Sequence, residues 1–301
     1  MSRPKVYVTR IIPEAGIEIL KQAAEVKVWE DELPPPREVI MREIREVDGL
    51  VSLLTDKIDA EVMDEGRNLK VISNYAVGFD NIDVPAATER GIMVTNTPGV
   101  LTETTADFAF ALLLATARRV VEADRHTRAG KWKTWVPTGF LGQDVHHATL
   151  GLVGLGRIGC EMARRAIGFS MKILYYDILR NERAERELGV EYTELDDLLK
   201  RSDFVSIHVP LTEKTYHLIG RREFGLMKRT AILINSARGP IVDTEALYEA
   251  LESGQIAGAG LDVTEPEPIP ADHPILRLDN LVIAPHIASA SVQTRTKMAT
   301  M

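Results

Sequence analysis

The feature that most constrains this chain is a glycine-rich loop between an apolar strand and a helix start, Gly151-Leu-Val-Gly154-Leu-Gly156-Arg-Ile-Gly159. In a G-x-G-x-x-G pattern the first glycine permits a tight turn, the second admits a pyrophosphate, and the third lets helix and strand pack closely. The helix N-terminus then offers N–H groups and the positive end of a dipole to phosphates. The loop therefore predicts a dinucleotide site.

The strand after this loop supplies a second signal. Residues 172–176 form a β-type run that ends in Asp177, 18 residues after Gly159, close to the roughly 20-residue spacing of an acid that accepts the ribose hydroxyls. A negative charge there disfavours a 2′-phosphate, so the pattern predicts NAD (NADH) as the cofactor. Arg180 follows three residues later and would soften that preference, so NADP is kept as an alternative.

Composition excludes several classes of protein. The chain has 301 residues, with 36 Lys+Arg against 44 Asp+Glu and a net charge of −8. This length favours two domains, and the acidic balance argues against nucleic acid or an anionic membrane as partner. A single cysteine is typical of the cytoplasm, where we expect the protein, and the longest apolar stretch, 108–117, is too short to span a bilayer.

Strands alternate with helices in two series, which predicts two α/β units with parallel sheets covered on both faces. The expected strands are 5–9, 26–29, 49–54, 69–75 and 92–95, then 148–153, 172–176, 203–208, 231–235, 257–262 and 281–284. Between the series, 101–129 is expected to be one long helix, too apolar for a solvated surface and typical of helices buried against a partner. The loop after it carries Trp132 and Trp135, which either pack within the loop, the favoured interpretation, or reach a neighbouring subunit.

Polar residues follow three of the later strands. Arg238 follows 231–235, Asp262 ends the run 258–262 with Glu267 beyond it, and His286 follows 281–285. Ligands of open α/β sheets bind beyond the carboxyl ends of the strands, so these side chains are expected to converge at the nicotinamide end of the cofactor. Glu265 is a rival to Glu267, since both precede a proline.

Several motifs together resemble the D-isomer-specific 2-hydroxyacid dehydrogenase family over essentially the whole chain, most closely its glyoxylate/hydroxypyruvate reductases. These are Asn74–Asp83, Val94–Pro98, Thr105–Asp107, the glycine loop, Val209–Thr212, Ser236–Gly239 and Pro285-His286. The resemblance implies a Rossmann coenzyme domain, 99–286, inserted in a flavodoxin-like substrate domain, 1–98, to which 287–301 returns. It also implies a homodimer formed through the coenzyme domain.

The same resemblance implies NAD(H)-dependent reduction of a small 2-oxo acid to the D-2-hydroxy acid. Arg238 would bind the substrate carboxylate and carbonyl, and His286 would donate a proton to the nascent alkoxide. Glu267 would pair with this histidine, orient it and favour its protonated form. It is preferred over Glu265 because the family's glutamate lies 29 residues after the arginine.

Further contacts follow from the resemblance. Substrate contacts are expected at Leu54, Val77, Gly78 and Arg238. Cofactor contacts are expected at Thr105, Gly154, Leu155, Gly156, Arg157, Ile158, Gly159, Asp177, His208, Val209, Pro210, Ser236, Ala237, Arg238, Asp262, His286 and Ala288.

Three alternatives stay open: a D-lactate dehydrogenase, a D-3-phosphoglycerate dehydrogenase, and a nicotinamide-sensing corepressor. The last is disfavoured because the chain keeps the Arg238, Glu267 and His286 set. No metal site is predicted, since the histidines and acids lack close ligand spacing and one cysteine cannot form a thiolate cluster.

Overall fold

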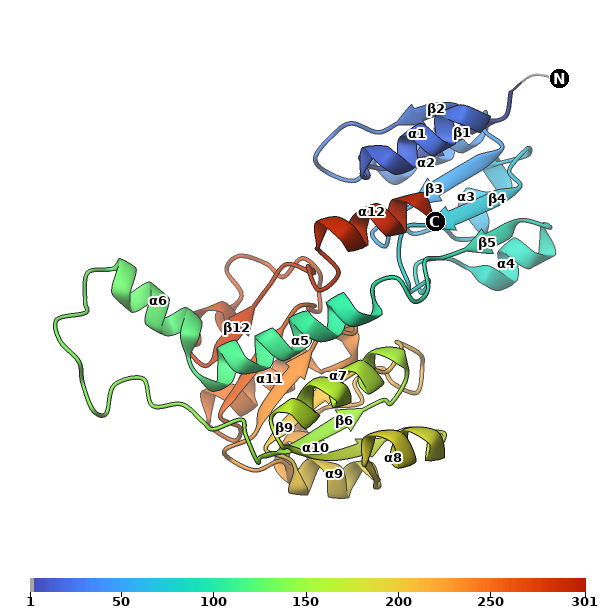
Figure 1. Ribbon diagram of the computed structural model, residues 1–301. Coiled ribbons are helices and arrows are strands. Elements are labelled where there is room, and N and C mark those ends of the chain that lie inside the picture. Colours follow the sequence, from blue (N-terminus) through green and yellow to red (C-terminus); the bar gives the residue numbers. More distant parts are fainter. Residues whose placement is uncertain (1–2) are drawn as a thin grey trace. The chain divides into compact units, whose positions relative to one another are not determined.

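The computed structural model describes residues 3–301, and these divide into two compact units (Figure 1). Unit 1 comprises the residues up to Leu101 together with Ser289–Met301, and unit 2 comprises Thr102–Ala288. The chain therefore leaves unit 1, builds unit 2 and then returns.

The described part of unit 1 contains a five-stranded parallel sheet in the order β2-β1-β3-β4-β5. Its strands are β1 (Lys5–Val8), β2 (Glu25–Val28), β3 (Gly49–Ser52), β4 (Val71–Asn74) and β5 (Met93–Thr95). The central strand β3 is buried at every residue because helices cover both faces of a parallel sheet. This strand order is the flavodoxin-like order, which confirms the predicted fold class of this unit.

Helices complete unit 1. They are α1 (Glu14–Ala23), α2 (Arg37–Ile44), α3 (Ala60–Glu65), α4 (Val84–Glu89) and α12 (Val292–Thr300). Asp59 and Asp83 begin α3 and α4 by accepting a hydrogen bond from a backbone N–H of the first turn, as good N-caps do. The C-terminal helix α12 packs on α1, and the Tyr75 hydroxyl donates to the carbonyl of Arg295 at 2.7 Å, which ties the returning segment to unit 1.

Unit 2 is built on a seven-stranded parallel sheet in the order β12-β11-β10-β9-β6-β7-β8. Its strands are β6 (Thr149–Val153), β7 (Lys172–Tyr176), β8 (Glu191–Tyr192), β9 (Phe204–Ile207), β10 (Ile232–Asn235), β11 (Gly258–Leu261) and β12 (Leu281–Ile283). The strand order reverses direction at β6, which lies between β7 and β9. Such a reversal is the switch point at which doubly wound sheets bind nucleotides, and the predicted Rossmann-type fold is confirmed.

The helices of unit 2 cover this sheet on both faces. They are α5 (Thr102–Ala117), α6 (Val120–Arg128), α7 (Arg157–Gly168), α8 (Glu182–Leu188), α9 (Leu195–Arg201), α10 (Arg221–Leu226) and α11 (Thr244–Glu252), with short 3₁₀ turns η1 (Gly239–Ile241) and η2 (Pro274–Arg277). Helices α9 and α10 have only seven and six residues, too few helical periods to be recognised from the sequence.

The expectation of one long helix over 101–129 is wrong. The backbone of Arg119 lies in the left-handed region, with φ of 54°, so α5 ends before it and α6 begins after it. A residue in that conformation cannot continue a right-handed helix. The Arg119 guanidinium is held by both carboxylate oxygens of Glu122, at 2.7 and 2.8 Å, which stabilises the break.

Packing inside unit 2 accounts for the apolar character of α5, so this character is no evidence for a partner. Ala109, Phe110 and Leu113 of α5 belong to a buried cluster shared with β10 and α7. The ring of Phe110 lies 4.9 Å from the ring of Phe169. The apolar face of α5 is therefore already covered by its own unit.

The segment after α5 is exposed to solvent, unlike α5 itself. Helix α6 has no buried residue, and residues 127–139 are all exposed. Trp132 and Trp135 are 68% and 79% exposed, so the expectation that they pack within the loop is wrong. In Figure 1, α6 and the loop that follows it extend away from the body of unit 2.

Candidate active site

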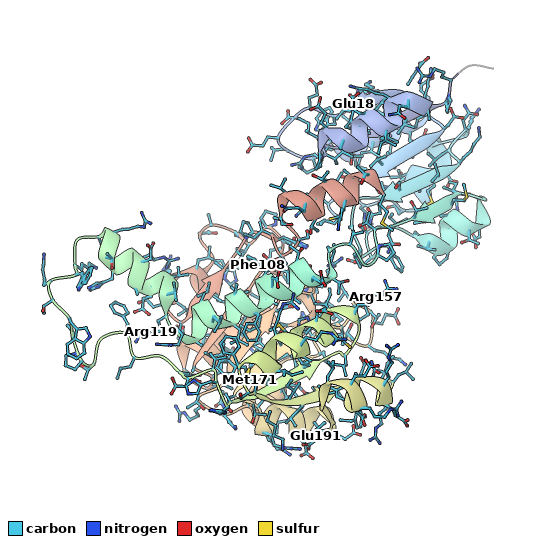
Figure 2. All side chains as sticks on the ribbon, in the orientation of Figure 1. Glu18, Phe108, Arg119, Arg157, Met171 and Glu191 are labelled. Carbon is cyan, nitrogen blue, oxygen red and sulfur yellow. The ribbon has the colours of Figure 1, made fainter. Side chains whose placement is uncertain are left out.

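The glycine loop connects β6 to α7, and Figure 2 shows Arg157 at the first turn of that helix. Gly154 has a φ of 100°, a backbone conformation that residues with a side chain rarely adopt. A Cβ at Gly159 would lie 2.3 Å from the carbonyl oxygen of Gly154, whereas a Cβ at Gly156 would meet nothing within 4 Å. The first and third glycines are thus required by the fold itself, and the second leaves an exposed stretch of bare backbone.

These residues fit a bound dinucleotide. Gly156 is the N-cap of the twelve-residue helix α7 and places no side chain over its first N–H groups. Asp177 follows β7, and one of its carboxylate oxygens accepts a hydrogen bond from the loop N–H of Leu155 at 2.8 Å. The Ser236 hydroxyl is buried and has no hydrogen-bond partner within the described residues. The loop would hold the phosphates, and Asp177 would accept the ribose hydroxyls.

The segment after β9 lies directly over the glycine loop. A Cβ at Gly154 would come within 2.8 Å of the backbone of His208 and 2.9 Å of the side chain of Val209. Burial lowers the pKa of His208 to about 4, and its Nε2 lies 2.9 Å from the Ser206 hydroxyl. His208 is therefore neutral at physiological pH and suits a packing or contact role better than proton transfer.

The three predicted catalytic residues follow three adjacent parallel strands. β10 pairs with β11 and β11 pairs with β12, with Asn235 opposite Leu261 and Leu261 opposite Ile283. The loops that carry Arg238, Glu267 and His286 therefore leave the sheet at the same carboxyl edge. This is also the edge that carries the glycine loop, as expected for a ligand site in such a sheet.

The two candidate glutamates, Glu265 and Glu267, contact different histidines. Glu267 Oε1 lies 2.6 Å from His286 Nδ1, whereas Glu265 Oε2 lies 2.7 Å from His217 Nε2. Burial by itself raises the pKa of Glu267, but the hydrogen bond and charge of His286 outweigh it, and the net pKa is lowered. The carboxylate of Glu267 thus stays ionised and holds the imidazole of His286 by a hydrogen bond to Nδ1.

Arg238 lies at the start of η1, close to this pair. Its carbonyl accepts a hydrogen bond from the Asn235 side chain at 2.9 Å, and its guanidinium donates to the carbonyl of Ala237 at 2.8 Å. The positive charge of Arg238 also contributes to the lowered pKa of Glu267. A guanidinium, an imidazole and a carboxylate thus gather in one electrostatic environment.

The turn that carries His286 is strained and anchored. His286 has a φ of 56°, which is uncommon for a residue with a side chain and costs free energy at many functional sites. Asp262 stabilises this turn by three hydrogen bonds. Its carbonyl accepts one from the N–H of His286 at 2.8 Å. Its carboxylate accepts two more, from the N–H groups of Ile287 and Ala288, at 2.7 and 2.8 Å. Burial raises the pKa of Asp262, which is 1% exposed.

This anchoring by Asp262 was missed by sequence reasoning, which expected only a cofactor contact there. The signal available was an acid at the end of an apolar strand, since a buried carboxylate must find hydrogen-bond donors nearby. Ala288, also expected as a cofactor contact, is buried at 5% exposure by this same turn.

The remaining candidates occupy two places. Thr105 lies in the first turn of α5 and is buried. In unit 1, Leu54 follows β3, and the turn after β4 carries Val77 and Gly78. The carbonyls of these two accept hydrogen bonds from the side chains of Asn96 and Asn74, at 2.8 and 2.9 Å.

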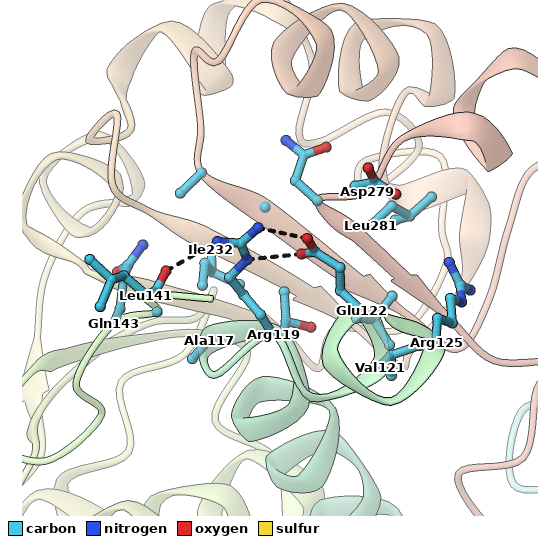
Figure 3. A pocket seen from close by; sticks show the side chains of 16 residues that line it. Ala117, Arg119, Val121, Glu122, Arg125, Leu141, Gln143, Ile232, Asp279 and Leu281 are labelled. Atoms are coloured by element: carbon cyan, nitrogen blue, oxygen red, sulfur yellow. Dashed lines mark hydrogen bonds and ion pairs between the residues drawn. The ribbon is translucent and has the colours of Figure 1, made fainter. Parts of the chain in front are cut away.

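A cavity of about 290 Å³ also lies in unit 2, beside α6 (Figure 3). It is lined by Ile232, Gly258 and Leu281, which are the first residues of β10, β11 and β12. The cavity thus lies at the amino ends of these strands, opposite the edge that carries Arg238 and His286. Figure 3 shows Arg119 in its wall, bonded to Glu122 and to the carbonyl of Leu141.

Two further searches cover residues 3–301. No cluster of three His, Cys, Asp or Glu side chains is placed to hold a metal ion. Within the same residues, none of the helices is both long enough and apolar enough to cross a membrane.

The reversal of strand order at β6, with the uncovered backbone at Gly156 and the charged groups on the same edge, defines the class: a dinucleotide-dependent α/β oxidoreductase. Comparison with known proteins agrees. Residues 110–288 match the family model for the D-isomer specific 2-hydroxyacid dehydrogenase NAD binding domain.

Relatives extend this match to the whole chain. A glyoxylate reductase of Korarchaeum cryptofilum is 61% identical over 300 residues, covering 99% of this chain and 90% of the relative. The crystal structure of the TT0316 protein from Thermus thermophilus superposes with a TM-score of 0.93 at 48% identity, covering 98% and 93% of the two chains.

A third comparison concerns a nucleotide complex. The NADPH-dependent glyoxylate/hydroxypyruvate reductase of Sinorhizobium meliloti, solved with NADP and malonate, has a TM-score of 0.86 at 35% identity and covers 99% and 91%. The chain belongs to the D-isomer specific 2-hydroxyacid dehydrogenase family, and its unit 2 contains the NAD-binding domain of that family.

Proposed function

We propose that the chain reduces glyoxylate, and hydroxypyruvate as a second substrate, to the 2-hydroxy acid with NADH as the electron donor. The observation that carries this proposal is the 2.6 Å contact between His286 and Glu267, close to Arg238, on the sheet edge that also carries the glycine loop. The 61% identity to a glyoxylate reductase supports the choice of substrate.

In this proposal each side chain has one task. Arg238 binds the substrate carboxylate and carbonyl through its fixed fork of N–H donors, which orients the carbonyl carbon. His286 donates the proton that the carbonyl oxygen takes up as it becomes a hydroxyl, and Glu267 orients the imidazole through its contact with Nδ1. The bound nicotinamide cofactor supplies the hydride.

The preference for NADH over NADPH rests on Asp177. Its carboxylate stands where the ribose hydroxyls are expected and would repel a 2′-phosphate, whereas NADP remains the alternative cofactor. Binding of NADH and NADPH, followed by quenching of protein fluorescence, tests the preference. Tighter binding of NADPH would show that Asp177 does not read the ribose.

We assign substrate binding to unit 1 and coenzyme binding to unit 2, as the resemblance implied. Leu54, Val77 and Gly78 are proposed substrate contacts. Support comes from the turn at Val77 and Gly78, whose backbone is held in place by Asn74 and Asn96. Val77→Asp should raise the KM for glyoxylate and leave NADH affinity unchanged.

The proposed assembly is a homodimer formed through unit 2, in the cytoplasm. Support comes from the exposed apolar residues of α6 and its loop. These are Val120, Trp132, Trp135, Val136 and Leu141, each more than half exposed. Such a patch marks an interface more often than a free surface. Sedimentation analysis should give twice the chain mass, and Trp132→Arg with Trp135→Arg should give the monomer.

The decisive experiment mixes the chain with NADH and glyoxylate and follows the loss of reduced nicotinamide absorbance. His286→Ala should lose most turnover and keep NADH affinity, whereas His146→Ala, an exposed histidine outside the site, should behave as the wild type. Faster turnover of pyruvate than of glyoxylate would indicate a D-lactate dehydrogenase. NADH binding without turnover of any small 2-oxo acid would indicate a sensor.

A further inference from the structure

Two side chains of opposite charge follow β7, where the ribose is expected. Asp177 and Arg180 are three residues apart, and they favour opposite cofactors. A carboxylate suits the free ribose hydroxyls of NAD, whereas an arginine at this place suits the 2′-phosphate of NADP. Whether the Arg180 guanidinium is already held by another side chain therefore affects the choice between NAD and NADP.

Arg180 is engaged by a carboxylate of the next helix. Its Nε donates to Glu185 Oε1 at 2.7 Å and its Nη2 donates to Glu185 Oε2 at 2.8 Å, a two-pronged ion pair. The guanidinium carbon also lies 5.9 Å from the ring centre of Tyr192. Two parallel charge-assisted hydrogen bonds occupy the edge of the guanidinium that a phosphate would otherwise take.

Glu185 is itself fixed in place. The Tyr175 hydroxyl donates to Glu185 Oε1 at 2.6 Å and accepts a hydrogen bond from the N–H of Asn181 at 2.8 Å. The Glu185 side chain is only 18% exposed, whereas that of Arg180 is 61% exposed. The hydrogen bond from Arg180, followed by that from Tyr175, lowers the pKa of Glu185 to about 2. Glu185 thus stays charged at every pH at which the enzyme would work.

The two arginines within α8 are paired differently from Arg180. Arg183 bonds to Glu187 at 2.7 Å and Arg186 lies 3.6 Å from Glu182, in both cases one helical turn apart on the exposed face. The pair of Arg180 and Glu185 differs because it joins the segment that follows Asp177 to the helix. This ion pair therefore determines whether the Arg180 guanidinium is available to a phosphate.

We propose that Glu185 is a positioning residue for cofactor selectivity, which holds Arg180 in an ion pair and so withholds from a 2′-phosphate the cation that would bind it. The proposal rests on the proposed NADH-dependent function and adds a second determinant to Asp177. Asp177 acts by direct contact and repulsion, whereas Glu185 acts through Arg180. Removing either acid alone leaves the other in force.

The test uses the full-length chain and measures the Kd values of NADH and NADPH by fluorescence in the absence of substrate. Asp177→Asn is the background, because it removes the direct repulsion and keeps an oxygen that can accept from Leu155 N–H. Glu185→Gln is then added, since glutamine keeps an acceptor for the Tyr175 hydroxyl. The matched control adds Glu182→Gln instead, which removes an equal charge from the same helix and releases Arg186 rather than Arg180.

The double variant Asp177→Asn/Glu185→Gln should bind NADPH about tenfold more tightly than the control double variant, which corresponds to one added charge-assisted hydrogen bond. The NADH affinities of these two double variants should agree within about twofold. Adding Arg180→Ala to the double variant should abolish the gain. Adenosine 2′,5′-bisphosphate should show the same differences in Kd, because it carries the 2′-phosphate without the nicotinamide.

Equal NADPH affinity in the two double variants would overturn the proposal, and so would a gain that survives Arg180→Ala. Loss of NADH binding on Glu185→Gln would assign the ion pair to support of the loop instead of selectivity. Failure of the proposed function is a different outcome, seen in the wild type as the absence of both NADH binding and glyoxylate turnover.

Discussion

The two glutamate–histidine pairs beside the proposed site allow one prediction to be worked out in detail. Glu267 pairs with His286 at 2.6 Å, and Glu265, two residues earlier, pairs with His217 at 2.7 Å. Changing each glutamate to glutamine removes a charge and keeps an oxygen that can accept a hydrogen bond. The comparison therefore isolates the effect of charge at two similar positions.

The strength of the interaction between Glu267 and His286 follows from their separation and from the exposure of their side chains. Two unit charges about 4 Å apart attract by about 1 kcal/mol in water and about 4 kcal/mol near a protein surface. The side chain of Glu267 is 36% exposed and that of His286 is 23% exposed, so solvent screening places the pair near the lower end. About 1.5 kcal/mol corresponds to about a tenfold change in rate when the charge of Glu267 stabilises the reacting imidazole.

Glu267→Gln should therefore lower kcat/KM for glyoxylate reduction about tenfold at pH 8. The loss should be similar from pH 6 to pH 9, because the pKa of Glu267 lies below its ordinary value and its charge is present throughout that range. NADH affinity should stay unchanged, and Glu265→Gln should change kcat/KM by less than about twofold at either pH. The assay is initial-rate NADH oxidation from pH 6 to pH 9.

Two results would refute this reasoning. An equal loss in Glu265→Gln would show that the turn as a whole, and not the charge on Glu267, supports the reaction. A loss of less than about twofold in Glu267→Gln would show that the charge on Glu267 does not support the reaction.

Further predictions concern stability and the loop. Because burial lowers the pKa of His208 to about 4 from 6.5, the unfolded chain binds a proton between those values that the folded chain does not. The free energy of unfolding in urea should thus fall by about 2 kcal/mol from pH 7 to pH 5, and His208→Gln should remove that slope. Gly156→Ala should keep the wild-type Tm but weaken NADH binding, since its Cβ meets open space, whereas Gly159→Ala should lower the Tm, since its Cβ would lie 2.3 Å from a carbonyl oxygen. Burial raises the pKa of the Cys160 thiol, so it should react with iodoacetamide more slowly than free cysteine at pH 8; equal rates would contradict its burial.

Local sequence signals were sufficient wherever the chemistry depends on a few neighbouring residues. The glycine spacing from Gly154 to Gly159 and the acid at Asp177 are enough to predict the class of cofactor site. The alternation of strands and helices predicted two parallel sheets, and both were found. Glycine loops and parallel strands can be recognised in this way because each imposes its requirement over a short stretch of chain.

Other features could not be predicted because their cause lies in contacts that only folding makes. The break at Arg119 depends on a left-handed backbone stabilised by Glu122 and the carbonyl of Leu141. The apolar character of α5 suggested a partner, but the covering surface is β10, β11 and α7 of the same unit, brought together only by folding. Periodicity reports that a face is buried and cannot say against what.

The sequence by itself determined the fold class, the family and the residues able to carry the chemistry, because glycines, acids and strand patterns are local properties of the chain. Only the tertiary structure decided which groups meet. It paired Glu267 with His286 and Glu265 with His217, placed the Asp262 carboxylate under the strained His286 turn, and joined Arg180 to Glu185. Hydrogen bonds and ion pairs act over a few ångströms, and folding alone brings residues distant in the chain within that reach.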